Sequence, residues 1–265
     1  VGSEMCIRDS NSRIKRLVQL NQKSKLRRTE DVFLAEGVKM FLEAPREQLQ
    51  EVYVSESFLE KCSCREHLEE VGYEVVSDSV FSKISDTCTP QGVLCVLKQF
   101  HYNIEEMLRD KAPLFLLLEN IQDPGNLGTM LRTGEGAGVS GIIMSRDTVD
   151  LYNPKVIRST MGSIYRVPFY YADDFAAAVH QVQQAGVSVY AAHLRGKNSY
   201  ACQDYTKGTA FLIGNEGNGL REETAELADC YIRIPMEGKV ESLNAAVASS
   251  ILMYEAHRQR ATIEK

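Results

Sequence analysis

The second half of the chain carries three blocks rich in glycine and polar residues, and each block directly follows an apolar run. The blocks span residues 119–132, 213–220 and 234–244. A short apolar run that ends in a glycine-containing turn before a helical pattern is typical of a buried parallel strand followed by a helix. Three such units predict an α/β domain whose apolar strands are covered on both faces of the sheet.

The first half of the chain alternates in the same way, with shorter segments. Strand patterns separated by helical patterns occur at residues 32–36, 51–55, 73–77 and 92–97. This alternation predicts a separate, smaller α/β domain with a mixed or parallel sheet.

Domain boundaries follow from the breaks in these patterns. We assign residues 11–99 to the first domain, residues 100–112 to a charged linker and residues 113–265 to the second domain. Residues 1–10 fit no periodic pattern, so we set them aside as extraneous to the fold or disordered.

Composition narrows the class of protein. No apolar run approaches the roughly 20 residues that a membrane span needs, and no signal-peptide pattern opens the sequence, so we expect a soluble cytoplasmic protein. The seven cysteines are scattered without paired spacing, with only Cys62 and Cys64 close together, and the five histidines are isolated. We therefore predict no metal site.

The net charge of −6 argues against nucleic-acid binding by bulk electrostatics, but one segment is strongly basic. Residues 13–28 contain no acidic residue, and apolar residues at 17, 18 and 20 fall on one possible helical face. Such a run has two interpretations: a basic helix face that is simply exposed to solvent, or a basic face that contacts the phosphates of an RNA backbone. The basic residues are Arg13, Lys15, Arg16, Lys23, Lys25, Arg27 and Arg28.

The polar residues of the blocks have structural explanations as well as functional ones. Asp123 and Asn126 are typical helix-capping residues, and Ser242 is a candidate N-cap for the last helix. Glu216 lies inside the turn of the second block, where it would repel a phosphate but not a sulfonium group or an arginine. The glycine spacing of this block matches neither dinucleotide-binding nor triphosphate-binding loops, so a conventional Rossmann-type enzyme is disfavoured.

Taken together, the three blocks resemble the signature blocks of the SpoU branch of the SPOUT methyltransferases. The resemblance covers residues 114–258 and implies transfer of a methyl group from S-adenosylmethionine to a ribose 2′-hydroxyl of RNA. It also implies a parallel-sheet domain with a C-terminal trefoil knot. Residues 33–39 and 89–96 resemble the RNA-binding domain, similar to a small ribosomal protein fold, that precedes many SpoU catalytic domains.

The resemblance also implies roles for individual residues. The family's functional polar residues fall on Asn126, Arg132, Glu216, Ser242 and Asn244. The cofactor pocket is implied for Gly214, Asn215, Gly217, Ile234, Pro235, Met236 and Leu243. At position 246 the family often has a serine where this chain has alanine, so no hydroxyl role is implied there.

These roles have to satisfy the chemistry of a ribose hydroxyl, which is a very weak acid. Arginine keeps its proton in proteins, so we interpret Arg132 as stabilising the developing alkoxide or steering a phosphate oxygen that accepts the proton. Glu216 would orient Arg132, and Asn126 and Asn244 would position the ribose or the backbone.

Structured RNA is the expected partner, with ribosomal RNA preferred over transfer RNA; a non-catalytic RNA-binding module is the alternative from a different class. We also expect a homodimer, because the last helix repeats apolar residues at 243, 247, 251 and 254 among small ones, and because SpoU-like enzymes use helices near the knot for a two-fold interface.

Overall fold

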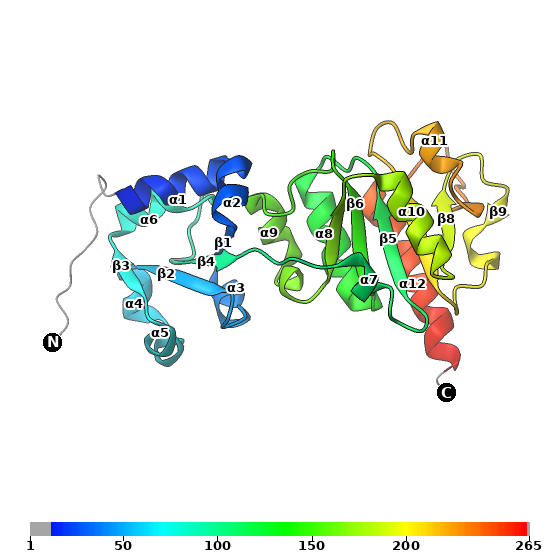
Figure 1. The fold of residues 1–265 in the computed structure, drawn as a ribbon. Helices are drawn as coiled ribbons and strands as arrows, with labels where there is room; N and C mark the ends of the chain where they lie inside the picture. The colour runs from blue at the N-terminus through cyan, green and yellow to red at the C-terminus, as the bar shows by residue number, and fades with distance from the viewer. Residues whose placement is uncertain (1–11, 264–265) are drawn as a thin grey trace. The chain divides into compact units, whose positions relative to one another are not determined.

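A computed structural model describes residues 12–263, so the prediction for residues 1–10 lies outside the described residues. The chain folds into two compact units (Figure 1). Unit 1 comprises residues 12–100 and 150–165, and unit 2 comprises residues 101–149 and the chain from residue 166. The predicted boundaries differ from this division at residues 150–165, which they place in the second domain.

Unit 1 is built around a four-stranded mixed sheet of order β1-β4-β2-β3, in which only the β2–β3 pair is parallel. Its strands are β1 (Val32–Glu36), β2 (Leu49–Ser55), β3 (Glu74–Val76) and β4 (Val93–Lys98). Its helices are α1 (Ser12–Gln22), α2 (Ser24–Glu30), α3 (Val38–Leu42), α4 (Glu56–Lys61), α5 (Arg65–Val71), α6 (Asp78–Ile84) and α9 (Pro154–Thr160), with a 3-10 turn at Ser163–Tyr165.

The two faces of this sheet are covered by segments far apart in the sequence. Leu17 and Leu20 of α1 pack with Phe81 of α6 in one hydrophobic cluster. The segment 150–165 packs in the same unit: the rings of Phe33 and Tyr152 lie 4.8 Å apart, and the Tyr165 hydroxyl donates to the Met40 carbonyl at 2.9 Å. Residues 150–165 therefore complete the core of unit 1, which no local sequence pattern indicated.

Unit 2 is built around a seven-stranded sheet of order β7-β6-β5-β10-β8-β11-β9 in which every strand pair is parallel. Its strands are β5 (Leu114–Leu118), β6 (Gly141–Ser145), β7 (Phe169–Ala172), β8 (Ser188–Ala192), β9 (Asn198–Ser199), β10 (Thr209–Ile213) and β11 (Cys230–Arg233). Its helices are α7 (Ile104–Met107), α8 (Pro124–Ala137), α10 (Phe175–Gln184), α11 (Glu222–Ala225) and α12 (Ala245–Ile263), with a 3-10 turn at Tyr200–Cys202. The predicted α/β class and parallel sheet are confirmed.

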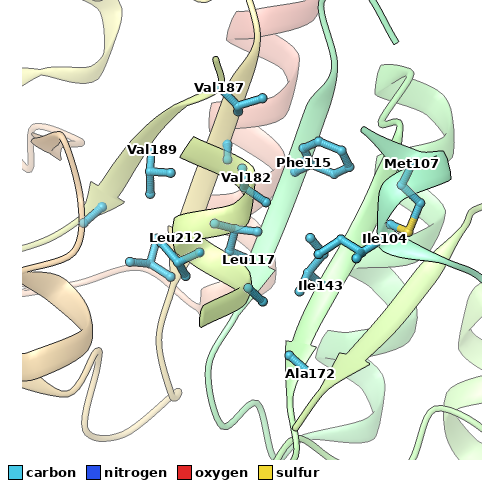
Figure 2. Packing of buried hydrophobic residues seen from close by; sticks show 14 residues of the cluster. Ile104, Met107, Phe115, Leu117, Ile143, Ala172, Val182, Val187, Val189 and Leu212 are labelled. Carbon is cyan, nitrogen blue, oxygen red and sulfur yellow. The ribbon is translucent and has the colours of Figure 1, made fainter. Parts of the chain in front are cut away.

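Alternate side chains of the central strands point to opposite faces of this sheet. Phe115 and Leu117 of β5 contact Val182 of α10 and Met107 of α7 in one buried cluster (Figure 2). On the other face, α12 packs against α8 and β10. All five residues of β5 are buried, as expected for a strand covered on both sides.

The predicted linker at residues 100–112 is partly structured. Ile104 and Met107 of α7 are buried in the core of unit 2. These two apolar residues are three positions apart and share one helical face, a signal that the surrounding charged residues concealed. The trefoil knot remains a prediction. Within residues 12–263, no helix is long and apolar enough to cross a membrane.

Candidate active site

Four neighbouring strands of unit 2 end at the same edge of the sheet. Because β5, β10, β8 and β11 are adjacent and parallel, the loops after Leu118, Ile213, Ala192 and Arg233 all leave from their carboxyl ends. Ligands of open α/β sheets bind outside the carboxyl ends of the strands. The three sequence blocks are three of these four loops.

The loop after β10 closes on itself through backbone hydrogen bonds. Asn215 and Gly219 exchange N–H···O=C bonds of 3.0 and 2.9 Å, and the Asn215 side chain accepts from the backbone N–H groups of Gly217 and Asn218. Gly214 lies against the far side of this loop, where an added Cβ would come within 2.2 Å of the Gly219 carbon and the Leu220 nitrogen. Only glycine fits at position 214 in this conformation.

A cavity of about 280 Å³ opens between the loops after β8, β10 and β11. Six of the seven residues predicted for the cofactor pocket line it; Pro235 does not. Ser242, predicted as a catalytic residue, also lines this cavity. The six are Gly214, Asn215, Gly217, Ile234, Met236 and Leu243.

The lining fits S-adenosylmethionine better than a phosphate-bearing ligand. Ile213, Ile232 and Leu243 supply apolar walls, and the two carboxylates of Glu216 and Glu241 outnumber the one guanidinium group, that of Arg233. Acidic side chains attract a sulfonium cation and repel phosphates. The closed loop at Gly214 offers backbone groups at close range, as a largely apolar pocket with a few polar contacts requires.

Glu216 is held by the turn that follows β5. Its carboxylate accepts hydrogen bonds from the backbone N–H groups of Asp123 (2.9 Å) and Gln122 (3.1 Å) and from the Asn126 amide (3.2 Å). Partial burial alone would raise the pKa of Glu216, but these hydrogen bonds outweigh it, and the pKa of the carboxyl is lowered. Glu216 is therefore ionised at neutral pH and positions the Gln122–Asn126 turn.

Asn244 connects this turn to the start of α12. Its amide donates to the Asn126 side-chain oxygen at 3.0 Å, and its own side-chain oxygen accepts from the backbone N–H groups of Ala246 (2.9 Å) and Val247 (3.2 Å). Asn244 is thus the N-cap of α12, and the prediction that Ser242 caps this helix was wrong. A continuous chain of hydrogen bonds runs from Glu216 through Asn126 to the helix.

An open groove lies beside the cofactor cavity and shares residues 215–217 with it. The groove is lined in part by Asn126, Glu216 and Asn244. Three of the five predicted catalytic residues therefore line this groove, and residues 215–217 form the wall between the groove and the cavity.

Arg132 does not join this groove. It lies six residues after Asn126 on α8, which places it about 120° around the helix axis, and its side chain is exposed. Within the described residues, the Arg132 guanidinium has no hydrogen-bond or ion-pair partner, so the expected pairing of Glu216 with Arg132 does not form in this structure. The Glu216 carboxylate instead accepts hydrogen bonds from the backbone N–H groups of Gln122 and Asp123, in the turn after β5.

Glu119 is a buried support that sequence reasoning did not select. It is 2% exposed and accepts from the Arg221 backbone N–H at 2.8 Å and from the Thr224 hydroxyl at 2.5 Å. Its carboxylate also pairs with the Arg221 guanidinium at 3.3 Å. Because Arg221 directly follows the cofactor loop, Glu119 fixes that loop to the end of β5. The available signal was a charged residue at the end of a fully apolar strand.

His193 and Leu194 line the cavity from the end of β8, and they were also missed. Sequence order does not reveal that β8 lies between β10 and β11. Only that arrangement brings its carboxyl end to the cofactor cavity.

The predicted RNA-binding run in unit 1 divides into three groups. Arg27 is only 3% exposed; it donates to the backbone carbonyls of Leu20 and Asn21 and pairs with Asp150 at 2.6 Å. Its assignment as an RNA ligand was therefore wrong, because its guanidinium group is buried and already binds Asp150 and two backbone carbonyls of the same unit. The second group is exposed on the surface of the unit and consists of Lys15, Lys23, Lys25 and Arg28.

The other two basic residues of the run pair with acidic residues of the same unit. Arg13 pairs with Glu74, and Arg16 pairs with Glu30 (2.6 Å) and Glu51 (2.8 Å). Their charge is partly neutralised. As for metals, the described part of the chain contains no group of three or more His, Cys, Asp or Glu residues that could hold an ion.

Comparison with known proteins agrees with this site. The sequence model of the SpoU rRNA Methylase family matches residues 113–254, and that of the MRM3-like substrate binding domain matches residues 11–95. The chain is 32% identical over 247 residues to 23S rRNA (guanosine(2553)-2'-O)-methyltransferase RlmP of Bacillus subtilis, covering 92% of this chain and 95% of that protein. It is 33% identical over 184 residues to 23S rRNA (guanosine-2'-O-)-methyltransferase RlmB of Ralstonia nicotianae, covering 68% and 74%.

Solved structures extend the match over both units. An AdoMet-bound rRNA methyltransferase from Sinorhizobium meliloti superposes with a TM-score of 0.82 at 31% identity, covering 95% of this chain and 96% of that one. The SpoU methyltransferase AviRb from Streptomyces viridochromogenes, in complex with AdoMet, superposes with a TM-score of 0.86 at 26% identity, covering 95% and 99%. With the three signature blocks gathered at one sheet edge, the chain belongs to the SpoU rRNA Methylase family.

Proposed function

We propose that this protein transfers a methyl group from S-adenosylmethionine to a ribose 2′-hydroxyl of ribosomal RNA. The observation that carries the proposal is the shared wall at residues 215–217, which separates a cofactor cavity from a polar groove. A methyl donor in the cavity and a ribose in the groove would meet across this wall. The names of the curated relatives, which act on 23S rRNA, support ribosomal RNA as the substrate class.

Asn126 and Glu216 have distinct tasks in this proposal. S-adenosylmethionine supplies a methyl group already activated on a positively charged sulfur. The lowered pKa of Glu216 makes its carboxylate a weak base, so Glu216 positions Asn126 rather than accepting the ribose proton. The Asn126 amide, fixed between Glu216 and Asn244, is placed to orient the acceptor sugar.

Arg132 needs a second subunit to take part. Arg132 and Gly136 lie four residues apart on the same face of α8, and Gly136 abuts Tyr254 of α12: an added Cβ on the glycine would lie 2.9 Å from the Tyr254 hydroxyl. We call Val247, Ile251 and Tyr254 the α12 apolar face; Val247 and Tyr254 are each 48% exposed. A homodimer that buries this face would also bring Arg132 to the interface, where it can stabilise the alkoxide in the partner's groove.

The oligomeric state tests that arrangement. Light scattering at micromolar concentration should give twice the chain mass of 29.7 kDa. Introducing charge on the α12 apolar face, by Val247→Glu with Tyr254→Glu, should yield an inactive monomer. An active species of monomer mass would contradict the role given to Arg132.

Mass spectrometry of 2′-O-methylated nucleosides tests the function itself. Ribosomal and transfer RNA from cells with and without this protein should differ at a ribosomal 2′-O-methylated nucleotide. A difference confined to transfer RNA would correct the substrate class. No difference in either RNA, with purified protein inactive on both, would favour a non-catalytic RNA-binding role.

A further inference from the structure

His193 lies in the wall of the cofactor cavity formed by the end of β8, a strand that carries none of the three signature blocks. It follows β8 directly, and its backbone N–H donates to the Ile232 carbonyl at 3.0 Å, which fixes the end of β8 against β11. The residue is half-buried and lines the cavity together with residues of the β10 and β11 loops. It is a titratable group that the proposed mechanism leaves unused.

The imidazole ring is fixed on two sides. It stacks on the ring of Tyr231 with centroids 4.9 Å apart and an interplanar angle of 25°. Its Nδ1 is 3.1 Å from the backbone nitrogen of Arg195, which has a hydrogen to donate. Nδ1 must therefore act as the acceptor, and the ring proton of the neutral imidazole resides on Nε2.

Several charged groups surround this ring. Partial burial, followed by the positive charge of Arg195, lowers the pKa of His193, whereas Glu222 acts in the opposite direction. Arg195 and Glu222 form an ion pair of 2.6 Å with each other, so their fields largely offset one another. Glu216, Arg233 and Glu241 line the same cavity.

Protonation of His193 would have two consequences at this position. A proton on Nδ1 would face the Arg195 N–H and break the side-chain hydrogen bond inside the turn at residues 193–196, which the Gly196 N–H and the His193 carbonyl close at 2.9 Å. It would also place a positive charge in the wall of a cavity that receives a sulfonium cation. Both effects oppose binding of the cofactor.

We infer that His193 is a cofactor-positioning residue whose neutral, Nε2-protonated imidazole forms part of the S-adenosylmethionine pocket, and that protonation of this ring weakens cofactor binding. This inference rests on the proposed function, because it takes the cofactor from there. It makes the β8 loop a third element of the cofactor cavity, beside the loops after β10 and β11.

Calorimetric titration with S-adenosylmethionine at several pH values tests the inference. For the wild type we expect the dissociation constant to rise by roughly threefold or more from about pH 8 to about pH 5.5, because a one-unit lower pKa in the bound protein changes affinity about tenfold only at pH values below both pKa values. His193→Asn keeps a side-chain oxygen that can accept from the Arg195 N–H but removes the titration. Its affinity should be lower than that of the wild type at the high pH, because the imidazole wall is lost, and should show only the pH dependence that the cofactor's own amino group contributes.

His180→Asn is the matched control, because His180 is exposed on α10 and lies outside the cavity lining. This variant should reproduce the wild-type pH dependence, including the titration of the cofactor's own amino group. An identical pH dependence in wild type and His193→Asn would overturn the inference. Absence of binding at any pH would overturn the proposed cofactor and the inference together.

A second measurement does not depend on any variant folding. The chain has five histidines, so imidazole nitrogen signals in a histidine-labelled wild-type protein can be assigned. The His193 signals should report the Nε2–H tautomer, and saturation with S-adenosylmethionine should lower the pKa of this ring further. An Nδ1–H tautomer, or a pKa that does not change on binding, would contradict the inference.

Discussion

The family resemblance selected polar residues at the carboxyl edge of the unit 2 sheet, and a run of like charge selected basic residues of unit 1, most of them on helices α1 and α2. The structure brings the first set together and separates the second. At the sheet edge, Asn126 lies 90 residues from Glu216 and 118 residues from Asn244, and the three side chains still meet through hydrogen bonds. On the helices, neighbouring basic residues separate: Arg27 is buried, whereas Arg28 is exposed.

The difference follows from what fixes each side chain. Parallel strands that lie next to each other must end at the same edge, so loops that follow them converge whatever their distance in sequence. On a helix, successive residues are rotated by about 100°, so adjacent charges face different surroundings. A loop after a parallel strand is therefore a better guide to a site than a run of like charges on a helix.

We expect the largest loss of methylation rate from substitution of Arg132, the predicted catalytic residue that lines neither the cavity nor the groove. Arg132→Ala should reduce methylation by roughly 10²–10³-fold, the cost of removing one donor to a developing oxyanion. Cofactor affinity should stay nearly unchanged, because Arg132 lines neither cavity nor groove. Single-turnover methylation and calorimetry measure the two quantities; a parallel loss of rate and affinity would place Arg132 in the donor pocket instead.

Gly214 tests whether the backbone of the sheet edge sets cofactor affinity. In Gly214→Ala, the new methyl would overlap the Gly219–Leu220 peptide, and overpacking of this kind costs about 1–3 kcal/mol. We expect cofactor affinity to fall by roughly tenfold or more in calorimetric titration. Gly217→Ala is the control, since its Cβ would lie 3.6 Å from the nearest atom, the Asn215 side-chain oxygen. Equal decreases in affinity in both variants would count against the close approach at Gly214.

The basic helices give a prediction about RNA. Replacing Lys15, Lys23, Lys25 and Arg28 with glutamine should weaken RNA binding and reduce the slope of log affinity against log salt by about 0.7–0.9 for each phosphate that is no longer neutralised. Filter binding at several salt concentrations measures this slope. An unchanged slope would mean that these exposed basic residues contact solvent and not RNA phosphates.

Arg27→Met separates buried from exposed charge within the same run. The variant leaves the partly buried Asp150 without its partner and removes the hydrogen bonds to the Leu20 and Asn21 carbonyls, which together should cost about 1–3 kcal/mol. Thermal unfolding should therefore show a lower midpoint than the wild type, with an unchanged salt slope at temperatures where the variant is folded. A change in slope without any decrease in stability would reinstate Arg27 as an RNA ligand.

The smallest effect is expected at Asn244. Asn244→Asp keeps an oxygen for the N–H groups of Ala246 and Val247, so α12 keeps its cap. The variant cannot donate to Asn126 and places a second carboxylate near Glu216. Stability should change by less than about 1 kcal/mol, as judged from thermal unfolding, whereas Asn244→Ala should lose about that amount. The rate of methylation should fall in both variants. Full activity in Asn244→Asp would show that the hydrogen bond from Asn244 to Asn126 is not needed for methylation.

Much of this site was accessible from sequence because the relevant constraints are local. The apolar runs that precede the first two blocks correspond to β5 and β10, and the glycine-containing turn of the second block corresponds to the cofactor loop after β10. The glycine at 138 that ends α8 has a φ of 78°, a conformation that glycine adopts without strain and that local sequence indicates well. The resemblance of these loops to the SpoU signature blocks selected Gly214, Glu216 and Asn244.

Other features depended on packing between distant segments and could not be derived from local pattern. The sequence determined which residues form strands, which loops are polar and which helices carry charge. Only the tertiary structure decided that β8 lies between β10 and β11, which brings His193 to the cofactor cavity. It alone decided that Asp150 neutralises Arg27 and that Glu216 holds the β5 turn rather than Arg132. The physical reason is the same in each case: hydrogen bonds and ion pairs are short-ranged, so they depend on which segments become neighbours, and strand order and domain packing decide that.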